Sequence, residues 1–216
     1  MKYLNNLIIK EKKGELEVED ILGLVKTGTA SLIPDLKILK SEIARKDSYS
    51  ALSVPYDRWI EIVCEFLEHG YARLVEIAHR DKYLAKFAIS ALEAAKSREG
   101  FLGIITIMKS YNLNDSLDYK NYVKCISAIN LMISFDDEIK FSEEESTLAR
   151  TLIHNYLNFT KEKLANESDI ITAYCALRKI GNFESLSILK KMPPIKNAEN
   201  IGIDKMVMSI IKKRMK

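Results

Sequence analysis

Residues 81–110 read DKYLAKFAISALEAAKSREGFLGIITIMKS. Apolar residues recur here three and four positions apart on both sides of Gly100, which is typical of two amphipathic helices joined at a glycine. Residues 168–193, SDIITAYCALRKIGNFESLSILKKMP, repeat the pattern 85 positions later without a gap. The matching apolar positions are Ala88, Ala91, Leu92, Ala95, Phe101 and Ile104 in the first stretch and Ala173, Ala176, Leu177, Ile180, Leu186 and Leu189 in the second. The pattern predicts a chain built from repeated helix pairs.

The composition is that of a folded helical protein. Of the 216 residues, 47% are hydrophobic and 29% charged, which is typical of a globular chain and not of a disordered one. Only 8 Gly and 4 Pro occur, too few for the many turns of a sandwich or barrel. We therefore expect an all-α fold, with residues 1–216 forming a single domain or one continuous array of small units.

The order of the apolar stripes divides this domain into three parts. We expect an N-terminal cap over residues 1–54, helix-pair repeats over 55–193 and a C-terminal capping helix over 194–216, with about 9–11 helices in all. The first 30 residues leave two alternatives open. Their alternation suits a small hairpin, whereas the spacing of Val18, Ile21, Leu22 and Val25 favours helices on both sides of Gly14.

Local signals mark several helix ends. Pro55 is expected to open one helix, and Gly70 to end it in a left-handed conformation. The other expected helix ends are Asp81 as an N-cap, Ser142 with Glu145 as a capping box, Gly181 as a helix stop and Asp204 as the cap of the last helix. The apolar residues expected inside that last helix are Met206, Val207, Ile210 and Ile211.

The fragments FAISALEAAKSREGFLGIITIM and AYCALRKIGNFESLSILKKM resemble HEAT repeats, which are two-helix units of about 40–47 residues. The resemblance implies an α-α superhelix of stacked antiparallel helix pairs. The first helices of successive pairs would begin near Pro55, Asp81, Asp118 and Ser168. A helical bundle is the alternative architecture.

No pattern of metal-binding or catalytic residues stands out. The 3 His and 3 Cys show no paired spacing, and neither a phosphate-binding glycine loop nor a nucleophile elbow is present. The acidic stretch DDEIKFSEEE (136–145) has Phe141 where a calcium loop needs glycine, so we interpret it as a solvated connection into a helix. The sequence predicts no cofactor, no metal and no enzymatic activity.

The cysteines and the apolar runs bear on the compartment. Cys64, Cys125 and Cys175 are far apart and lie among apolar residues, so we expect reduced core residues and a reducing compartment. No apolar run is long enough to span a bilayer, and the first residues do not form a signal peptide. A cytoplasmic protein without a membrane partner is expected.

The leading functional hypothesis is a non-catalytic protein-binding module, because stacked helix pairs present a continuous surface to a partner. An adaptor, or an antitoxin or immunity protein that blocks a toxin, would fit such a chain. If the second helices of the pairs line the inner side, the candidate partner-binding residues are Arg73, Glu76, Lys109, Arg150 and His154, with His154 on the exposed side of its helix.

Nucleic-acid binding is the alternative. The chain resembles HEAT-like alkylpurine DNA glycosylases, which gather aromatic residues and a carboxylate on the concave side; Asp57, Arg58 and Trp59 would supply such groups. Trp59 lies on an apolar stripe and is expected in the core. The net charge of only +3 gives this class weak support, although Lys212, Lys213, Arg214 and Lys216 form a basic cluster. A third hypothesis is a structural bundle that dimerises through its N-terminal segment.

Overall fold

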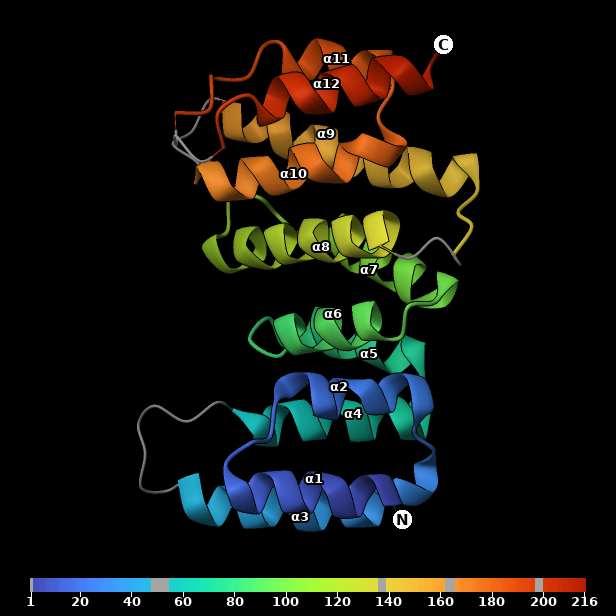
Figure 1. Ribbon diagram of the computed structural model, residues 1–216, viewed down its shortest axis with the longest axis vertical. Coiled ribbons are helices and arrows are strands. Elements are labelled where there is room, and N and C mark those ends of the chain that lie inside the picture. Colours follow the sequence, from blue (N-terminus) through green and yellow to red (C-terminus); the bar gives the residue numbers. More distant parts are fainter. Residues whose placement is uncertain (1, 48–54, 136–138, 162–165, 197–199) are drawn as a thin grey trace. The chain divides into compact units, whose positions relative to one another are not determined.

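The computed structural model describes residues 2–47, 55–135, 139–161, 166–196 and 200–216 (Figure 1). These residues form twelve α-helices and one short 3₁₀ turn, and no strand occurs among them. The all-α prediction is therefore confirmed, with slightly more helices than the expected 9–11. The chain divides into two compact units, Met1–Lys96 and Ser97–Lys216, each with its own packing.

The first unit holds six α-helices in two-helix layers. The layers are α1 with α3, α2 with α4, and α5 with α6 (Figure 1). The bounds are α1 Lys2–Lys13, α2 Val18–Thr27, the 3₁₀ turn Ala30–Leu32, α3 Ile33–Asp47, α4 Tyr56–His69, α5 Tyr71–Arg80 and α6 Ala85–Ala94. Helices lie on both sides of Gly14, whose φ is 72°, so the described part of the first 30 residues is helical and does not form the alternative hairpin.

The second unit also consists of two-helix layers, and here each layer joins helices that follow one another in the chain. The layers are α7 with α8, α9 with α10, and α11 with α12 (Figure 1). Their bounds are α7 Arg98–Ser110, α8 Ser116–Phe135, α9 Glu143–Lys161, α10 Glu167–Ile180, α11 Phe183–Leu189 and α12 Ile203–Arg214.

The repeated apolar positions form the core, as the sequence predicts. All twelve residues of the two matching stretches are buried. Ala88 and Ala91 on α6, like Ala173 and Ala176 on α10, have almost no exposed surface, because their small side chains allow a neighbouring helix to approach closely. The apolar pattern that recurs after 85 residues therefore corresponds to core positions that recur in the structure.

The pairing of the helices differs from the expected one. Gly100 does not separate two helices but lies in the first turn of α7. The break comes earlier, at Lys96 with φ 44° and at Ser97, whose Oγ accepts the N–H of Gly100 at 3.0 Å. Because α6 packs on α5 and α7 packs on α8, the observed pairs are shifted by one helix from those expected to begin near Asp81 and Asp118.

Helix ends that depend on local chemistry are predicted better. Ser142 and Glu145 form the expected capping box: Glu145 N–H donates to Ser142 Oγ at 3.1 Å, and Ser142 N–H donates to Glu145 Oε2 at 2.7 Å. Arg98 Nε also donates to Glu145 Oε1, at 2.5 Å. Asp81 caps the turn before α6, accepting the N–H groups of Tyr83 and Leu84.

The last helix departs from its predicted cap. Gly202, with φ 87°, is the N-cap of α12, and Asp204 lies inside its first turn.

Gly181 is the C-cap of α10, as predicted. A Cβ at Gly181 would lie 2.7 Å from Ile211 Cδ1, so α12 packs against a position that has no room for a side chain.

Two of the three cysteines lie in the core, as predicted, and Cys175 does not. Cys64 and Cys125 are buried, Cys175 is half-buried, and all three are free. Burial raises the pKa of each thiol, so the thiolate is disfavoured.

Within the described part of the chain, no helix combines the length and the apolar character needed to cross a membrane.

Candidate functional site

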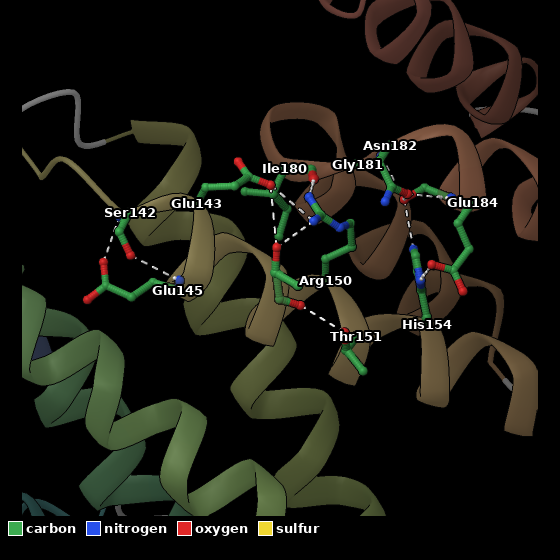
Figure 2. Close-up of polar contacts among 12 residues, drawn as sticks. Ser142, Glu143, Glu145, Arg150, Thr151, His154, Ile180, Gly181, Asn182 and Glu184 are labelled. Atoms are coloured by element: carbon green, nitrogen blue, oxygen red, sulfur yellow. Dashed lines mark hydrogen bonds and ion pairs between the residues drawn. The ribbon is translucent and has the colours of Figure 1, made fainter.

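Arg150 is the most strongly bonded of the predicted site residues. It lies on α9 and is buried, and its guanidinium donates from Nη1 to the carbonyl of Ile180 at 2.6 Å (Figure 2). Its Nη2 donates to Thr147 Oγ1 at 2.6 Å and to Glu143 Oε1 at 3.1 Å. Arg150 therefore satisfies one of the carbonyls that the C-terminus of α10 leaves without a helical partner.

Arg214, near the end of α12, approaches the same place from another helix. Its Nη2 donates to the carbonyl of Gly181. Loss of water lowers the pKa of Arg214, and the positive charge of Arg150 lowers it further, against the opposing effect of Glu143. Two guanidinium groups thus meet at the C-terminus of α10, whose partial negative charge attracts cations.

A cavity of about 330 Å³ opens beside these arginines. We call it the arginine pocket. Its polar side chains are those of Glu143, Ser146, Arg150, Lys179, Asn182 and Arg214. Three of these side chains are cationic and one is anionic, so the pocket has an excess of positive charge.

His154 lies one turn beyond Arg150 on α9 and is only 4% exposed, so the prediction that it faces solvent is wrong. Its Nε2 lies 2.7 Å from Ser185 Oγ, and its Nδ1 lies 3.7 Å from Glu184 Oε2 (Figure 2). The sequence does not indicate this pair, because His154 and Ser185 are 31 positions apart in the chain. The arrangement has the order of a Ser-His-acid triad.

Burial prevents this triad from acting on a substrate in the observed conformation. Ser185 is completely buried, and its Oγ accepts the N–H of Asn182 at 3.0 Å as part of the capping box that begins α11. Burial also lowers the pKa of His154, with Arg150 adding to the effect and Glu184 opposing it. The neutral imidazole therefore serves as a hydrogen-bonding link between α9 and α11.

The other predicted partner-binding residues lie elsewhere. Arg73 and Glu76 belong to the first unit, where Arg73 bonds Glu65 at 2.6 Å and Glu76 at 2.8 Å, and Arg80 bonds Glu76 at 2.8 Å. Lys109 is exposed near the end of α7, in the second unit. Of the five predicted residues, Arg73 and Glu76 bond each other in the first unit, and Arg150 and His154 lie one turn apart on α9 in the second.

The groups compared with a DNA glycosylase form ordinary surface contacts. Arg58 pairs with Asp57 at 3.6 Å and with Glu61 at 3.4 Å. Trp59 is half-buried and not in the core as expected; its ring meets Phe87 edge-on, with 4.6 Å between the ring centroids. The Trp59 ring is thus in contact with another ring of the same unit.

Among the described residues, no group of His, Cys, Asp and Glu side chains is arranged to hold a metal ion. The predicted acidic connection lies partly outside the described residues, which exclude Asp136, Asp137 and Glu138. Glu143, Glu144 and Glu145 open α9, as expected for the positive end of a helix dipole.

The α11–α12 layer carries apolar residues in contact with solvent. α12 buries Val207 and Ile211 but leaves Met206 and Ile210 exposed, so only half of the predicted apolar stripe is inside. Phe183, 71% exposed, begins α11, and Ile201, 70% exposed, precedes α12. We call Phe183, Ile201, Met206 and Ile210 the terminal patch.

Phe183 and Ile201 are not predictable from the sequence as surface residues, because an apolar residue at a helix start is ordinarily interpreted as core. The basic residues of this segment are also at the surface. Residues 190–216 hold eight Lys or Arg against two Asp or Glu, and the eight cations are exposed. The end of the chain thus combines apolar and cationic surface.

Comparisons of the chain with known protein families, with curated proteins and with solved structures find no match.

Proposed function

We propose that this chain is a HEAT-like helical protein with a non-catalytic role, and that its terminal patch binds an acidic protein partner. The observation that carries the proposal is the exposure of Phe183, Ile201, Met206 and Ile210 on one helical layer, beside an excess of cations. The two-helix layers of the second unit, built from consecutive helices, support the HEAT-like interpretation.

The terminal patch has the composition of a protein interface. Single exposed apolar residues are common on any protein, but several on one layer mark a surface that gains from being covered. Aromatic residues and Met are enriched in protein interfaces, and a few residues near the centre of an interface carry most of the binding energy. Met206 and Ile210, one turn apart on α12, share a face on which a partner can lie.

The charge of the segment indicates an acidic partner. Exposed cations around an apolar centre attract a surface of opposite charge, which speeds association and excludes basic partners. An acidic toxin that the chain blocks, or an acidic component that an adaptor recruits, would present such a surface. Nucleic acid satisfies the cations but offers its phosphates, and not apolar groups, to the terminal patch.

Glutamate substitution of the terminal patch tests the proposal. The chain is co-expressed with the products of the genes beside its own, and the dissociation constant of any complex is measured by calorimetry. Because a buried glutamate at an interface centre removes a major apolar contact and adds an unpaired charge, we expect Ile210→Glu and Met206→Glu each to weaken binding at least about 30-fold. Ile38→Glu, on an exposed isoleucine of α3 in the first unit, is the control and should change affinity less than about twofold.

Two results would contradict the proposal. One is a complex whose affinity is the same in all three variants. The other is binding to DNA or to anionic lipid vesicles, with steep salt dependence, in the absence of a protein complex.

A further inference from the structure

We propose that the arginine pocket binds an oxyanion, namely a carboxylate from the acidic partner or a free phosphate of similar geometry. This inference rests on the proposed function, because it names the group of the partner that the second unit recognises. It adds a polar, directional contact to the apolar contact of the terminal patch.

The unused donors of Arg214 are the first argument. A guanidinium carries five N–H donors in a planar fork that matches a carboxylate or phosphate. Among the described residues, Arg214 reaches one acceptor, the carbonyl of Gly181, while its side chain lines the pocket. An oxyanion in the pocket would occupy donors that the protein leaves to solvent.

The balance of charge is the second argument. Arg150, Lys179 and Arg214 line the cavity with one carboxylate, that of Glu143, against them. The two guanidinium groups repel each other, as the lowered pKa of Arg214 reflects after the larger effect of its partial loss of water. An anion between them would relieve this repulsion in a site partly shielded from solvent.

Glu143 shows how such an anion is held. Its carboxylate contacts Arg150 Nη2 at 3.1 Å, yet its side chain is 83% exposed (Figure 2). A residue this exposed at the first turn of α9 can move aside at little cost. Glu143 therefore acts as an internal competitor, occupying the place on Arg150 that an incoming oxyanion would take.

The position of the pocket relative to the terminal patch favours the partner as the source. Met206, Ile210 and Arg214 follow one another at intervals of four residues and so share one face of α12. On the other side of the pocket, Asn182 directly precedes Phe183. A partner that covers the terminal patch would place an acidic side chain within reach of Arg214.

The pocket is tested first without a partner. Calorimetric titration with inorganic phosphate and with N-acetylglutamate measures the affinity of the chain and of three variants. We expect Arg214→Gln to weaken binding about tenfold or more, since it removes a charged bidentate donor. Lys213→Gln, which removes the same charge from the neighbouring exposed residue, should change affinity less than about twofold. Glu143→Gln should tighten binding severalfold, because it removes the competing carboxylate.

The Glu143 variant separates a binding role from a structural one. If Arg150 and Arg214 only cap α10, Glu143→Gln leaves anion affinity unchanged or weakens it, and the inference fails. It also fails if Lys213→Gln and Arg214→Gln weaken binding equally. It fails as well if neither phosphate nor N-acetylglutamate binds to the unmodified chain or to the Glu143→Gln variant. Urea unfolding of Arg214→Gln and Arg214→Lys shows whether each variant keeps a folded second unit; in the folded Arg214→Lys variant the loss should be partial.

Titration of the protein partner distinguishes the sources and the two proposals. Phosphate that competes with the partner, together with weaker partner binding by Arg214→Gln, assigns the pocket to a partner carboxylate. Phosphate that binds tightly without competing assigns it to a free anion. If the partner is lost in Ile210→Glu but retained in full by Arg214→Gln, and neither probe binds, the proposed function stands and the pocket inference is overturned.

Discussion

His154 shows how a residue is changed by the helices around it. Its imidazole lies between α9 and α11, bonded to Ser185 and facing Glu184, with Arg150 one turn away on its own helix. Burial favours the neutral ring and lowers its pKa from the ordinary 6.5. Because protonation of this ring is less favourable in the folded protein than in the unfolded chain, the free energy of unfolding depends on pH.

We expect the free energy of unfolding to fall as the pH is lowered from 7.5 to 5.5. The unfolded chain takes up a proton on this histidine near pH 6.5, while the folded protein resists it, so the contribution is complete above the unfolded pKa and is lost as the pH falls towards the folded one. Urea unfolding at the two pH values measures the effect.

The variants His154→Gln and His79→Gln make this test specific. Glutamine at 154 keeps a polar group near Ser185 but does not titrate, so its loss of stability between pH 7.5 and 5.5 should be smaller. His79 is exposed, and its replacement should leave the pH dependence of the original chain. Equal pH dependence in all three proteins would show that His154 is not the group responsible.

The burial of a single residue could be predicted from the sequence only where the apolar spacing within its own helix determines it. The spacing of Leu152 and Tyr156 indicates one buried face of α9, and both are buried. The burial of Arg150 and His154 depends on α10 and α11 covering a second face of the same helix, and nothing within α9 signals this. The arginine pocket was unpredictable for the same reason, because Arg150 and Arg214 meet across 64 positions of sequence.

At the scale of the element, signals contained within one turn were the most reliable. The Ser142–Glu145 capping box was predicted correctly because both partners lie within one turn of helix. The stripe of α12 was only half correct. Met206 and Ile210 have the same hydrophobic character as Val207 and Ile211, but which of them is buried depends on how α12 packs on α10 and α11.

Gly70 offers a test of backbone geometry between elements. The prediction of a left-handed end to α4 is correct in φ, which is 73°, but ψ is −161°, and α5 begins at the next residue. This region is open almost only to glycine, so we expect Gly70→Ala to lower the free energy of unfolding by about 1–3 kcal/mol.

Glu68→Ala, at an exposed position of the same helix end, serves as the control for this prediction. It should change stability by no more than about 0.5 kcal/mol. The cost at Gly70 is strain and not a clash, because an added Cβ would have no neighbour within 4 Å. A Gly70→Ala protein as stable as the original chain would show that α4 and α5 can be joined by another backbone conformation.

At the scale of the molecule, the sequence predicted stacked helices but not their grouping. Each amphipathic helix offers one apolar face, and a repeated pattern of such faces is satisfied by pairing with either the preceding or the following helix. The echo between residues 81–110 and 168–193 therefore identifies equivalent positions without deciding which helices are partners. In the first unit the pairs α1–α3 and α2–α4 skip a helix, which no repeat pattern in the sequence suggests.

The division into two units predicts that the second can fold alone. We expect a chain of residues 97–216 to keep the helical circular dichroism of its six helices and to unfold cooperatively in urea, because α7–α12 enclose their own core. Within that chain, Phe101→Ala should lower the unfolding free energy by about 3–5 kcal/mol, since Phe101 is completely buried. A disordered fragment would show that the units depend on each other.

The absent side chain at Gly181 has a consequence for the far end of α12. An added methyl would meet Ile211 Cδ1 at 2.7 Å and the carbonyl oxygen of Leu177 at 2.7 Å. Either Ile211 or the backbone at the end of α10 would have to shift, and Arg214 lies three positions after Ile211 on the same helix. The absence of a side chain at Gly181 thus helps to determine where the guanidinium of Arg214 lies.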